Sequence, residues 1–194
     1  MGDAVANRRL ELTDLSSQHP GVPASCEGHL VVSAAVALDR HHKPPKTVDV
    51  WIGGAVEPYE ADWREPTAEE KRYCADKNDT TCYGAYAVAL AAAFAHLGLK
   101  AVSRVGGGTG RKGEGKGSDW YVLPIDEEVD DWPWENPKIE RLEVSGIDTG
   151  DAGKRNTRLR QKAVQTQKGI VRHIPAYAVI VEFDSPLVVF ARAS

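Results

Sequence analysis

The chain has 194 residues, of which 42% are hydrophobic and 27% are charged, and its formal net charge is -4. This balance is typical of a globular domain with its own core, and it excludes a uniformly basic protein built to coat nucleic acid. The three cysteines form no CxxC pair, which argues against a disulfide framework and a structural zinc site. No apolar run approaches the roughly 20 residues that cross a bilayer, and the first residues lack the apolar core of a signal peptide. We therefore expect a cytoplasmic protein without a membrane segment.

Residues 1–66 are predicted to form a β-rich extension. Residues 1–28 are polar and are expected to be extended and only partly ordered. The apolar run at 29–38, HLVVSAAVAL, favours a strand, although its alanines leave a helix open. The segment 47–54, TVDVWIGG, alternates apolar and polar side chains as a half-buried strand does. The following VEPYEADW indicates a short edge strand, because Pro58 cannot donate a hydrogen bond to a neighbouring strand.

Residues 67–194 are predicted to form the core, which makes one compact domain with the extension. Thr67 and the acids after it begin a short helix, because a hydroxyl caps helix N-termini and acids favour the positive end of the helix dipole. The run YGAYAVALAAAFAHLG predicts a second helix, which ends at Gly98 and is apolar nearly all round, so we expect it to be buried against a sheet. Strands are predicted at 99–105, 119–124, 138–147, 176–183 and 187–193, and a polar, basic helix at 154–168. This order indicates an α/β (α+β) fold with a central mixed β-sheet flanked by helices.

The segment Gly110–Ser118, GRKGEGKGS, connects the first two of these strands and has two interpretations. It reads G-x-x-x-x-G-K, which is close to a phosphate-binding loop. Such a loop needs a helix directly after it and a hydroxyl at the next position. Here DWYVLP follows, and Gly117 stands where the hydroxyl is needed. The sequence therefore favours a basic connection between antiparallel strands, with or without a function of its own.

Two carboxylates lie on neighbouring predicted strands. Asp119 opens the second strand, and Glu143 lies inside the third. Because side chains alternate along a strand, Glu143 shares its face with Arg141 and Ser145. A charge within a sheet is unfavourable unless it is paired or binds a cation. Two carboxylates on adjacent strands suit magnesium or manganese, which prefer oxygen ligands and activate water for attack on phosphorus.

The order of elements and these residues resemble the PD-(D/E)xK nuclease superfamily, which has a restriction-endonuclease-like fold. The resemblance covers residues 67–184, where SDW would supply the motif Asp as Asp119 and LEVSG the motif Glu as Glu143. The pattern GTG…DW…RLEVSG is similar to uncharacterised bacterial proteins of this superfamily. The resemblance implies an αβββαβ core and magnesium- or manganese-dependent cleavage of phosphodiester bonds in DNA, less often RNA, in processes such as restriction, repair or phage defence.

One position departs from the family pattern. The motif lysine, which helps to position and activate the attacking water, would fall at Ser145. Some relatives take a lysine or another polar group from the following helix instead. Lys162 is the best candidate for that role, with Gln161 and Gln165 nearby, whereas Lys154 lies at the helix start on a predicted turn.

Basic residues gather in the same part of the sequence. The segment 154–172 holds seven basic residues and no acid. We expect its helix to form, with the glycine-rich loop, a basic groove that contacts nucleic acid beside the two carboxylates; a solvated helix face is the alternative. At helical spacing, one side of this helix is expected to carry Arg155, Arg158 and Lys162. The expected nucleic-acid contacts are Arg111, Lys112, Lys116, Arg155 and Arg158.

The sequence therefore supports two classes of function. In the first, the protein is a metal-dependent nuclease in which Asp119 and Glu143 bind magnesium or manganese, while Ser145 and Lys162 complete the site. In the second, it is a catalytically degenerate relative that binds nucleic acid or protein, as a homodimer or as a subunit of a defence complex. The alanine-rich helix and the tryptophan-containing acidic loop would then be contact surfaces.

Overall fold

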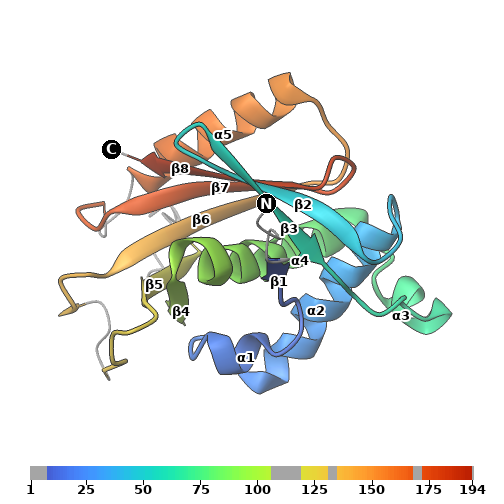
Figure 1. The fold of residues 1–194 in the computed structure, drawn as a ribbon, viewed down its shortest axis with the longest axis horizontal. Helices are drawn as coiled ribbons and strands as arrows, with labels where there is room; N and C mark the ends of the chain where they lie inside the picture. Colours follow the sequence, from blue (N-terminus) through green and yellow to red (C-terminus); the bar gives the residue numbers. More distant parts are fainter. Residues whose placement is uncertain (1–7, 106–118, 131–134, 168–171, 194) are drawn as a thin grey trace, which may run out of the picture.

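One curled mixed sheet of eight strands organises the fold. The computed structural model describes residues 8–105, 119–130, 135–167 and 172–193. Within them the strand order is β1-β3-β2-β8-β7-β6-β5-β4, and five α-helices surround the sheet (Figure 1). The predicted mixed sheet flanked by helices is confirmed at this level.

The N-terminal part contains three strands and two helices, so it is less β-rich than predicted. Its elements are β1 (Arg9–Leu10), α1 (Leu15–Gln18), α2 (Ala24–Asp39), β2 (Lys46–Ile52) and β3 (Ala55–Ala61). β2 pairs with β3 in an antiparallel manner and with β8 in parallel, so these strands continue the sheet of the C-terminal part. The alternation predicted for 47–54 is confirmed, because Val48 and Val50 are buried whereas Trp51 is exposed.

The strand predicted at 29–38 is wrong, because this segment lies inside α2. Its buried residues include Leu30, Ala34 and Leu38, which recur at helical spacing. Small side chains also let α2 lie against α4 (Lys77–Ala92) at close range. A Cβ added to Gly84 of α4 would stand 2.9 Å from the Ser33 carbonyl oxygen. A short apolar run of this kind looks the same in a buried strand and in a helix packed on another helix.

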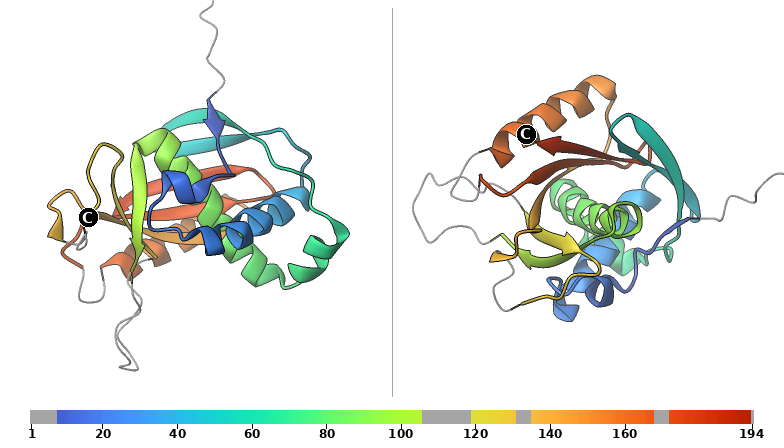
Figure 2. Two further views of the ribbon diagram at one scale, coloured as in Figure 1. Left: turned by 90° about the horizontal axis from the view of Figure 1, so that it is seen from below. Right: turned by 60° about the vertical axis from the view of Figure 1, so that its left-hand side comes forward.

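Two helices and a π-helical turn precede the central strands. α3 (Ala68–Tyr73) has the predicted cap, in which the Thr67 hydroxyl accepts a hydrogen bond from the Glu70 N–H and the Glu70 carboxylate accepts one from the Thr67 N–H. α4 continues into the π-helical turn η1 (Ala93–Leu97), and Gly98 ends it in the left-handed conformation at φ 62°. α4 lies within the concave side of the sheet, with α2 beside it (Figure 2). The prediction that this helix is buried against a sheet is confirmed.

The segment Lys77–Leu97, formed by α4 and η1, is the one described helix that is long and apolar enough to cross a membrane. Its most apolar stretch is 67% buried inside the protein. A helix that is apolar all round and buried in this way is typical of the core of a soluble-type fold. Its composition is therefore explained by packing against α2 and the sheet.

The C-terminal part builds the rest of the sheet around a crossover helix. Its elements are β4 (Leu99–Arg104), β5 (Trp120–Pro124), β6 (Glu140–Ile147), α5 (Ala152–Thr166), β7 (Ala176–Glu182) and β8 (Leu187–Ala193). β4, β5 and β6 are antiparallel neighbours, β6 and β7 are parallel, and β7 and β8 are antiparallel. α5 joins β6 to β7 and covers the face of the sheet opposite α4 (Figure 1). The strands and the helix predicted for this part are confirmed.

The glycine-rich segment Gly110–Ser118 lies outside the described residues. The elements on either side of it are described, and β4 and β5 pair in an antiparallel manner. The chain enters strand β5 after the segment, where a phosphate-binding loop needs a helix. The predicted connection between antiparallel strands is therefore confirmed.

β5 covers only the first part of β6 and leaves a free strand edge beyond it. The ladder between the two strands ends at the pair Trp120↔Leu142. Among the described residues, no strand pairs with this side of β6 farther along, whereas β7 follows its other side to the end. Because alternate residues direct their backbone groups to the same side of a strand, those of Val144 and Gly146 point out of the free edge.

Candidate active site

Asp119 occupies the point where β5 and β6 diverge. Its backbone N–H donates a hydrogen bond of 2.8 Å to the Leu142 carbonyl oxygen, at the end of the pairing between β5 and β6. One carboxylate oxygen accepts a hydrogen bond from the Val144 N–H at 2.8 Å, and the other accepts one from the Tyr86 hydroxyl at 2.8 Å. The carboxylate is thereby fixed between the edge of β6 and α4.

Tyr86 of α4 holds the Asp119 carboxylate from the side of the helix. Its ring packs edge-on against Trp120 with centroids 6.1 Å apart, and the Arg104 guanidinium lies 5.0 Å from the centre of each ring. Burial and the charge of Asp119 raise the pKa of Tyr86, so its hydroxyl stays protonated and donates. Tyr86 therefore orients Asp119 and also supports Arg104, a cation at the end of β4.

Glu143 lies inside β6 and is paired with a lysine of α5. The Lys162 ammonium donates a hydrogen bond of 2.5 Å to Glu143 Oε1, and the two side chains are 18% and 5% exposed. Burial and the charge of Asp119 raise the pKa of Glu143, and Lys162 opposes both. The two carboxylates therefore interact electrostatically, and Lys162 compensates the buried charge of Glu143.

β6 and α5 present facing side chains along their length. Four helical residues rise about 6.0 Å and two strand residues about 6.6 Å, so every fourth position of α5 stays nearly level with every second position of β6. The facing pairs are Arg141 with the Thr166 carbonyl oxygen, Glu143 with Lys162, and Ser145 with Arg158 across a shared cavity. The face of β6 predicted to carry polar residues is thus the face toward α5.

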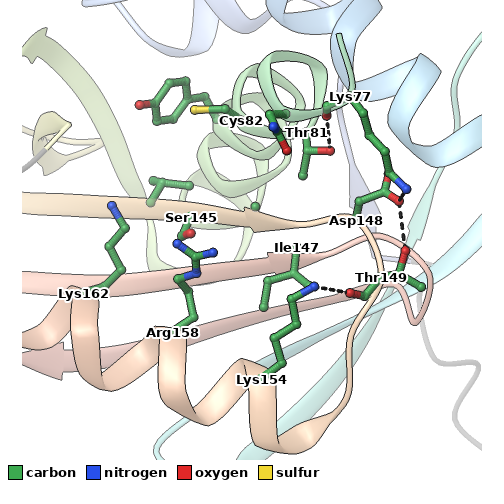
Figure 3. Close-up of a pocket in the computed structure, with 14 residues that line it drawn as sticks. Lys77, Thr81, Cys82, Ser145, Ile147, Asp148, Thr149, Lys154, Arg158 and Lys162 are labelled. Carbon is green, nitrogen blue, oxygen red and sulfur yellow. Dashed lines mark hydrogen bonds and ion pairs between the residues drawn. The ribbon is translucent and has the colours of Figure 1, made fainter. Parts of the chain in front are cut away.

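A cavity of about 430 Å³ runs along the free edge of β6, between α4 and α5 (Figure 3). Lys154, Arg158 and Lys162 extend from successive turns of α5 toward β6. Cys82 and Thr81 line the cavity from α4. The cavity therefore combines cations, small polar groups and the backbone of an unpaired strand edge.

Asp148 follows β6 at the far end of this cavity. Its carboxylate lies 2.6 Å from the Lys77 ammonium, 2.9 Å from the Arg40 guanidinium and 3.3 Å from His41 Nε2. Burial alone would raise the pKa of Asp148, but hydrogen bonds from Lys77, Arg40 and Thr149 lower it to about 2. This charged and compensated carboxylate joins the ends of α2 and α4 to the sheet.

Most of the residues singled out from the sequence are brought together in the structure. Lys162 is bonded to Glu143 inside β6, and Asp119 is bonded to the neighbouring Val144 N–H, so that its charge acts on Glu143. Ser145 and Arg158 line the adjoining cavity. The site is thus assembled from β5, β6 and α5, with Tyr86 contributed by α4.

Arg155 was expected beside Arg158 and Lys162, but it lies on another side of α5. Its guanidinium pairs with Glu182 of β7 at 2.6 Å and lies 5.7 Å from the centre of the Trp51 ring. Lys154 lines the cavity instead, because positions 154, 158 and 162 recur every four residues along one helix face. The remaining expected contacts lie outside the described residues: Arg111, Lys112 and Lys116.

Other contributors were set aside or not singled out from the sequence. Lys154 was set aside because it lies at the helix start, although its spacing of four residues from Arg158 and eight from Lys162 places all three on one helix face. Tyr86 stands in a buried, alanine-rich helix, where a phenol hydroxyl needs a hydrogen-bond partner. The sequence therefore indicates that Tyr86 needs a hydrogen-bond partner. It does not indicate which one, because Asp119 is 33 positions away along the chain. Arg104 carried no comparable signal.

The carboxylate oxygens of Asp119 and Glu143 are of the type that a small divalent cation prefers. The described residues contain no group of three or more His, Cys, Asp or Glu side chains placed to hold a metal ion. Magnesium is commonly held by one or two carboxylates, with water and substrate phosphate in the other positions. Each Asp119 oxygen has a second lone pair beyond the hydrogen bond it accepts, and Lys162 engages only Oε1 of Glu143. Asp119 and Glu143 are therefore the residues that could hold such an ion.

Comparison with known proteins adds no relative to this description. No family model, no curated protein and no solved structure matches the chain. The function is therefore inferred from the geometry and chemistry of the site.

Proposed function

We propose that the protein is a metal-dependent nuclease that hydrolyses phosphodiester bonds in DNA or RNA. The observation that carries this proposal is the Lys162–Glu143 pair in β6, with the Asp119 carboxylate bonded to the Val144 N–H one residue along the same strand, where β5 and β6 diverge. The order α4, β4, β5, β6, α5, β7 also agrees with the αβββαβ arrangement expected of a restriction-endonuclease-like protein. Two carboxylates and a lysine at a diverging pair of central strands suit hydrolysis of a phosphate ester.

Each residue of the site would have a different role in such a reaction. Magnesium or manganese, bound by Asp119 and Glu143, would supply positive charge to the reacting phosphate and lower the pKa of water. Lys162 would replace the lysine that is absent at Ser145, because its ammonium has three donors and bonds to Glu143 with one of them. The others would stabilise negative charge that develops on the phosphate. Tyr86 would keep Asp119 in position through the 2.8 Å hydrogen bond.

The surrounding charges favour a polyanionic substrate. Arg104 lies beside Tyr86 at one end of the site, and Lys154 and Arg158 line the cavity at the other. Cations on both sides of two carboxylates would hold phosphates on either side of the reacting one. The net charge of -4 does not oppose this, because the acids are concentrated in other segments of the chain, such as 57–70 and 126–135.

The proposal is tested by incubating the protein with labelled single-stranded and duplex DNA and RNA in the presence of magnesium or manganese. We expect cleavage that a chelator abolishes. Asp119→Asn and Glu143→Gln should each lower the rate by more than about 100-fold, because each removes one of the two charged ligands. Glu140→Gln is the matched control, since Glu140 lies in the same strand but pairs with Arg192.

Two results would contradict the nuclease. Cleavage that survives both Asp119→Asn and Glu143→Gln would come from another site or from a contaminant. Absence of cleavage on every substrate, together with no calorimetric signal for magnesium or manganese, would remove the proposed activity.

A non-catalytic nucleic-acid-binding protein is the second candidate. It is favoured because the charged groups of the site already have partners within the protein. Asp119 accepts hydrogen bonds at both carboxylate oxygens, and Lys162 is paired with Glu143. In addition, Ser145 occupies the position of the motif lysine. Binding of oligonucleotides without cleavage under any metal condition would establish this candidate in place of the first.

A further inference from the structure

We propose that the cavity along the free edge of β6 binds the sugar-phosphate backbone of a single, unpaired polynucleotide strand beyond the reacting phosphate. This inference deepens the proposed function and rests on it for the choice of a polynucleotide as ligand. The cavity begins at Lys162, beside Glu143, and extends to Lys154 and Asp148. The strand would therefore run from the carboxylates along β6.

The cations of α5 are spaced along the direction of the cavity. Lys154, Arg158 and Lys162 are four residues apart, so they rise by about 6 Å per step and span about 12 Å. Figure 3 shows all three extending toward β6. Such a row suits successive phosphates of one extended strand, with Arg158 and Lys154 reaching phosphates that follow the one at Lys162. The substrate would then need at least two further nucleotides on one side.

Arg158 is the cation in this row that is best able to take a phosphate. It is exposed, and within the described part of the chain the structure gives it neither an acid nor a carbonyl partner. Lys162 is paired with Glu143, and Lys154 donates to the Thr149 carbonyl oxygen at 2.5 Å. An unpaired guanidinium offers two parallel donors to a phosphate without first giving up a protein contact.

The acids that border the cavity are already compensated. Glu143 faces Lys162, and Asp148 faces both Lys77 and Arg40. The charges left to act on a ligand in the cavity are therefore those of Arg158 and Lys154. This balance favours an anion over a cationic or neutral ligand.

The size of the cavity favours one strand over a duplex. At about 430 Å³ it is within the range of small-molecule sites, about 300 to 1,000 Å³. Its walls are close to β6: a Cβ on Gly146 would stand 2.4 Å from the Thr81 carbonyl oxygen, so α4 is already at the limit of approach. A B-form duplex, whose major groove alone is about 12 Å wide, would contact only the rim. A single backbone would enter and lie along the edge of β6.

Binding in this cavity should be insensitive to base sequence. Tyr86 is the one aromatic side chain among the described lining residues, and it is 8% exposed and engaged with Asp119. Bases stack on exposed aromatic rings in proteins that read or grip them. The cavity instead offers cations, the Ser145 hydroxyl and strand backbone, which contact phosphate and sugar.

The test measures fluorescence anisotropy of a labelled DNA strand of about 12 nucleotides with the full chain in a chelator, so that cleavage does not interfere. We expect the single strand to bind more tightly than the same strand in a duplex. Arg158→Ala should weaken single-strand binding about tenfold and reduce the slope of log affinity against log salt by about 0.7, as expected for one lost phosphate contact. Arg160→Ala, which removes an equal charge from an exposed position of α5 outside the described cavity lining, should change neither.

The outcomes separate this inference from the proposed activity. Equal effects of Arg158→Ala and Arg160→Ala, equal binding of duplex and single strand, or displacement of the strand by polyglutamate at the same charge concentration would each overturn the binding site. Cleavage in magnesium without an Arg158 effect leaves the nuclease standing and removes the site. An Arg158-dependent single-strand complex that is never cleaved keeps the site and removes the nuclease.

Discussion

Several buried polar side chains in this protein have a specific hydrogen-bond partner, and His19 is one of them. It is fully buried, and its Nδ1 accepts a hydrogen bond of 2.9 Å from the Ala101 N–H. The Gly21 N–H donates to the Ala101 carbonyl oxygen at 2.9 Å, so the segment around His19 covers the outer edge of β4. Burial lowers the pKa of His19 to about 4. The imidazole is therefore neutral in the folded protein at neutral pH.

This pKa predicts how stability depends on pH. The unfolded chain binds a proton at His19 below its ordinary pKa of 6.5, whereas the folded protein does so only below about 4. The His19 contribution to the free energy of unfolding is thus complete above pH 6.5 and falls by about 3 kcal/mol between pH 6.5 and 4. Urea denaturation at several pH values should show this slope in the wild type and a shallower slope in His19→Gln. Identical slopes in the two proteins would show that His19 is not the group responsible.

The positions of Glu143 and Lys162 could be predicted from the sequence, because the side-chain repeat of a strand or a helix depends only on neighbouring residues. Alternation in β6 places Glu143 on one face, and the helical period places Lys162 among the residues that face it. The Tyr86–Asp119 contact was not predictable in this way, because it joins α4 to β5 across the sheet. Such long-range contacts depend on the packing of whole elements.

Packing of α4 against its neighbours sets the shape of the site. α4 contacts α2 on one side and the central strands on the other, and glycines mark its closest approaches. A Cβ at Gly146 of β6 would lie 2.4 Å from the Thr81 carbonyl oxygen and 3.0 Å from the Ala85 Cβ. The distance between α4 and β6, and with it one wall of the cavity, depends on the missing side chain at Gly146.

Replacement of this glycine should be unfavourable. Gly146→Ala should lower the free energy of unfolding by about 1 to 3 kcal/mol, because α4 must move away from β6. Gly28→Ala is the matched control: Gly28 lies within α2 with no atom within 4 Å of an added Cβ, so it should raise stability by about 0.5 to 1 kcal/mol. Thermal or chemical denaturation of the two variants gives the comparison. A neutral Gly146→Ala would mean that α4 and β6 are not in such close contact.

The elements differ in how well sequence alone defines them. The five C-terminal strands were predictable because each is bounded by turn residues and has either alternating or continuous apolar character. α2 was not predictable, because the apolar run at 29–38 is compatible with both a buried strand and a buried helix unless its packing against α4 is known. The free edge of β6 was also unpredictable, because it depends on where β5 stops pairing.

For the protein as a whole, the net charge is negative, but the cavity between α4 and α5 is lined mainly by positive side chains. The formal net charge is -4, yet the cavity between α4 and α5 is lined by Lys77, Lys154, Arg158 and Lys162. Asp148 holds α2, α4 and the end of β6 together through Arg40 and Lys77. The fold thus fixes two helices on either side of one strand edge, and the carboxylates lie where that edge begins. This arrangement links the architecture to the proposed cleavage of a phosphate backbone.

In the proposed nuclease, Lys162 completes a catalytic site with Asp119 and Glu143. The most direct measurement compares cleavage rates of a single-stranded oligonucleotide in magnesium for the wild type, Lys162→Met and Arg160→Met, below the melting temperature of each. Lys162→Met should lose more than about 100-fold in rate, because it removes the cation that faces Glu143 and that would face the phosphate of the proposed substrate. Arg160→Met should cleave as the wild type does. A Lys162→Met variant that cleaves at the wild-type rate, or a wild type that cleaves nothing, would contradict the account.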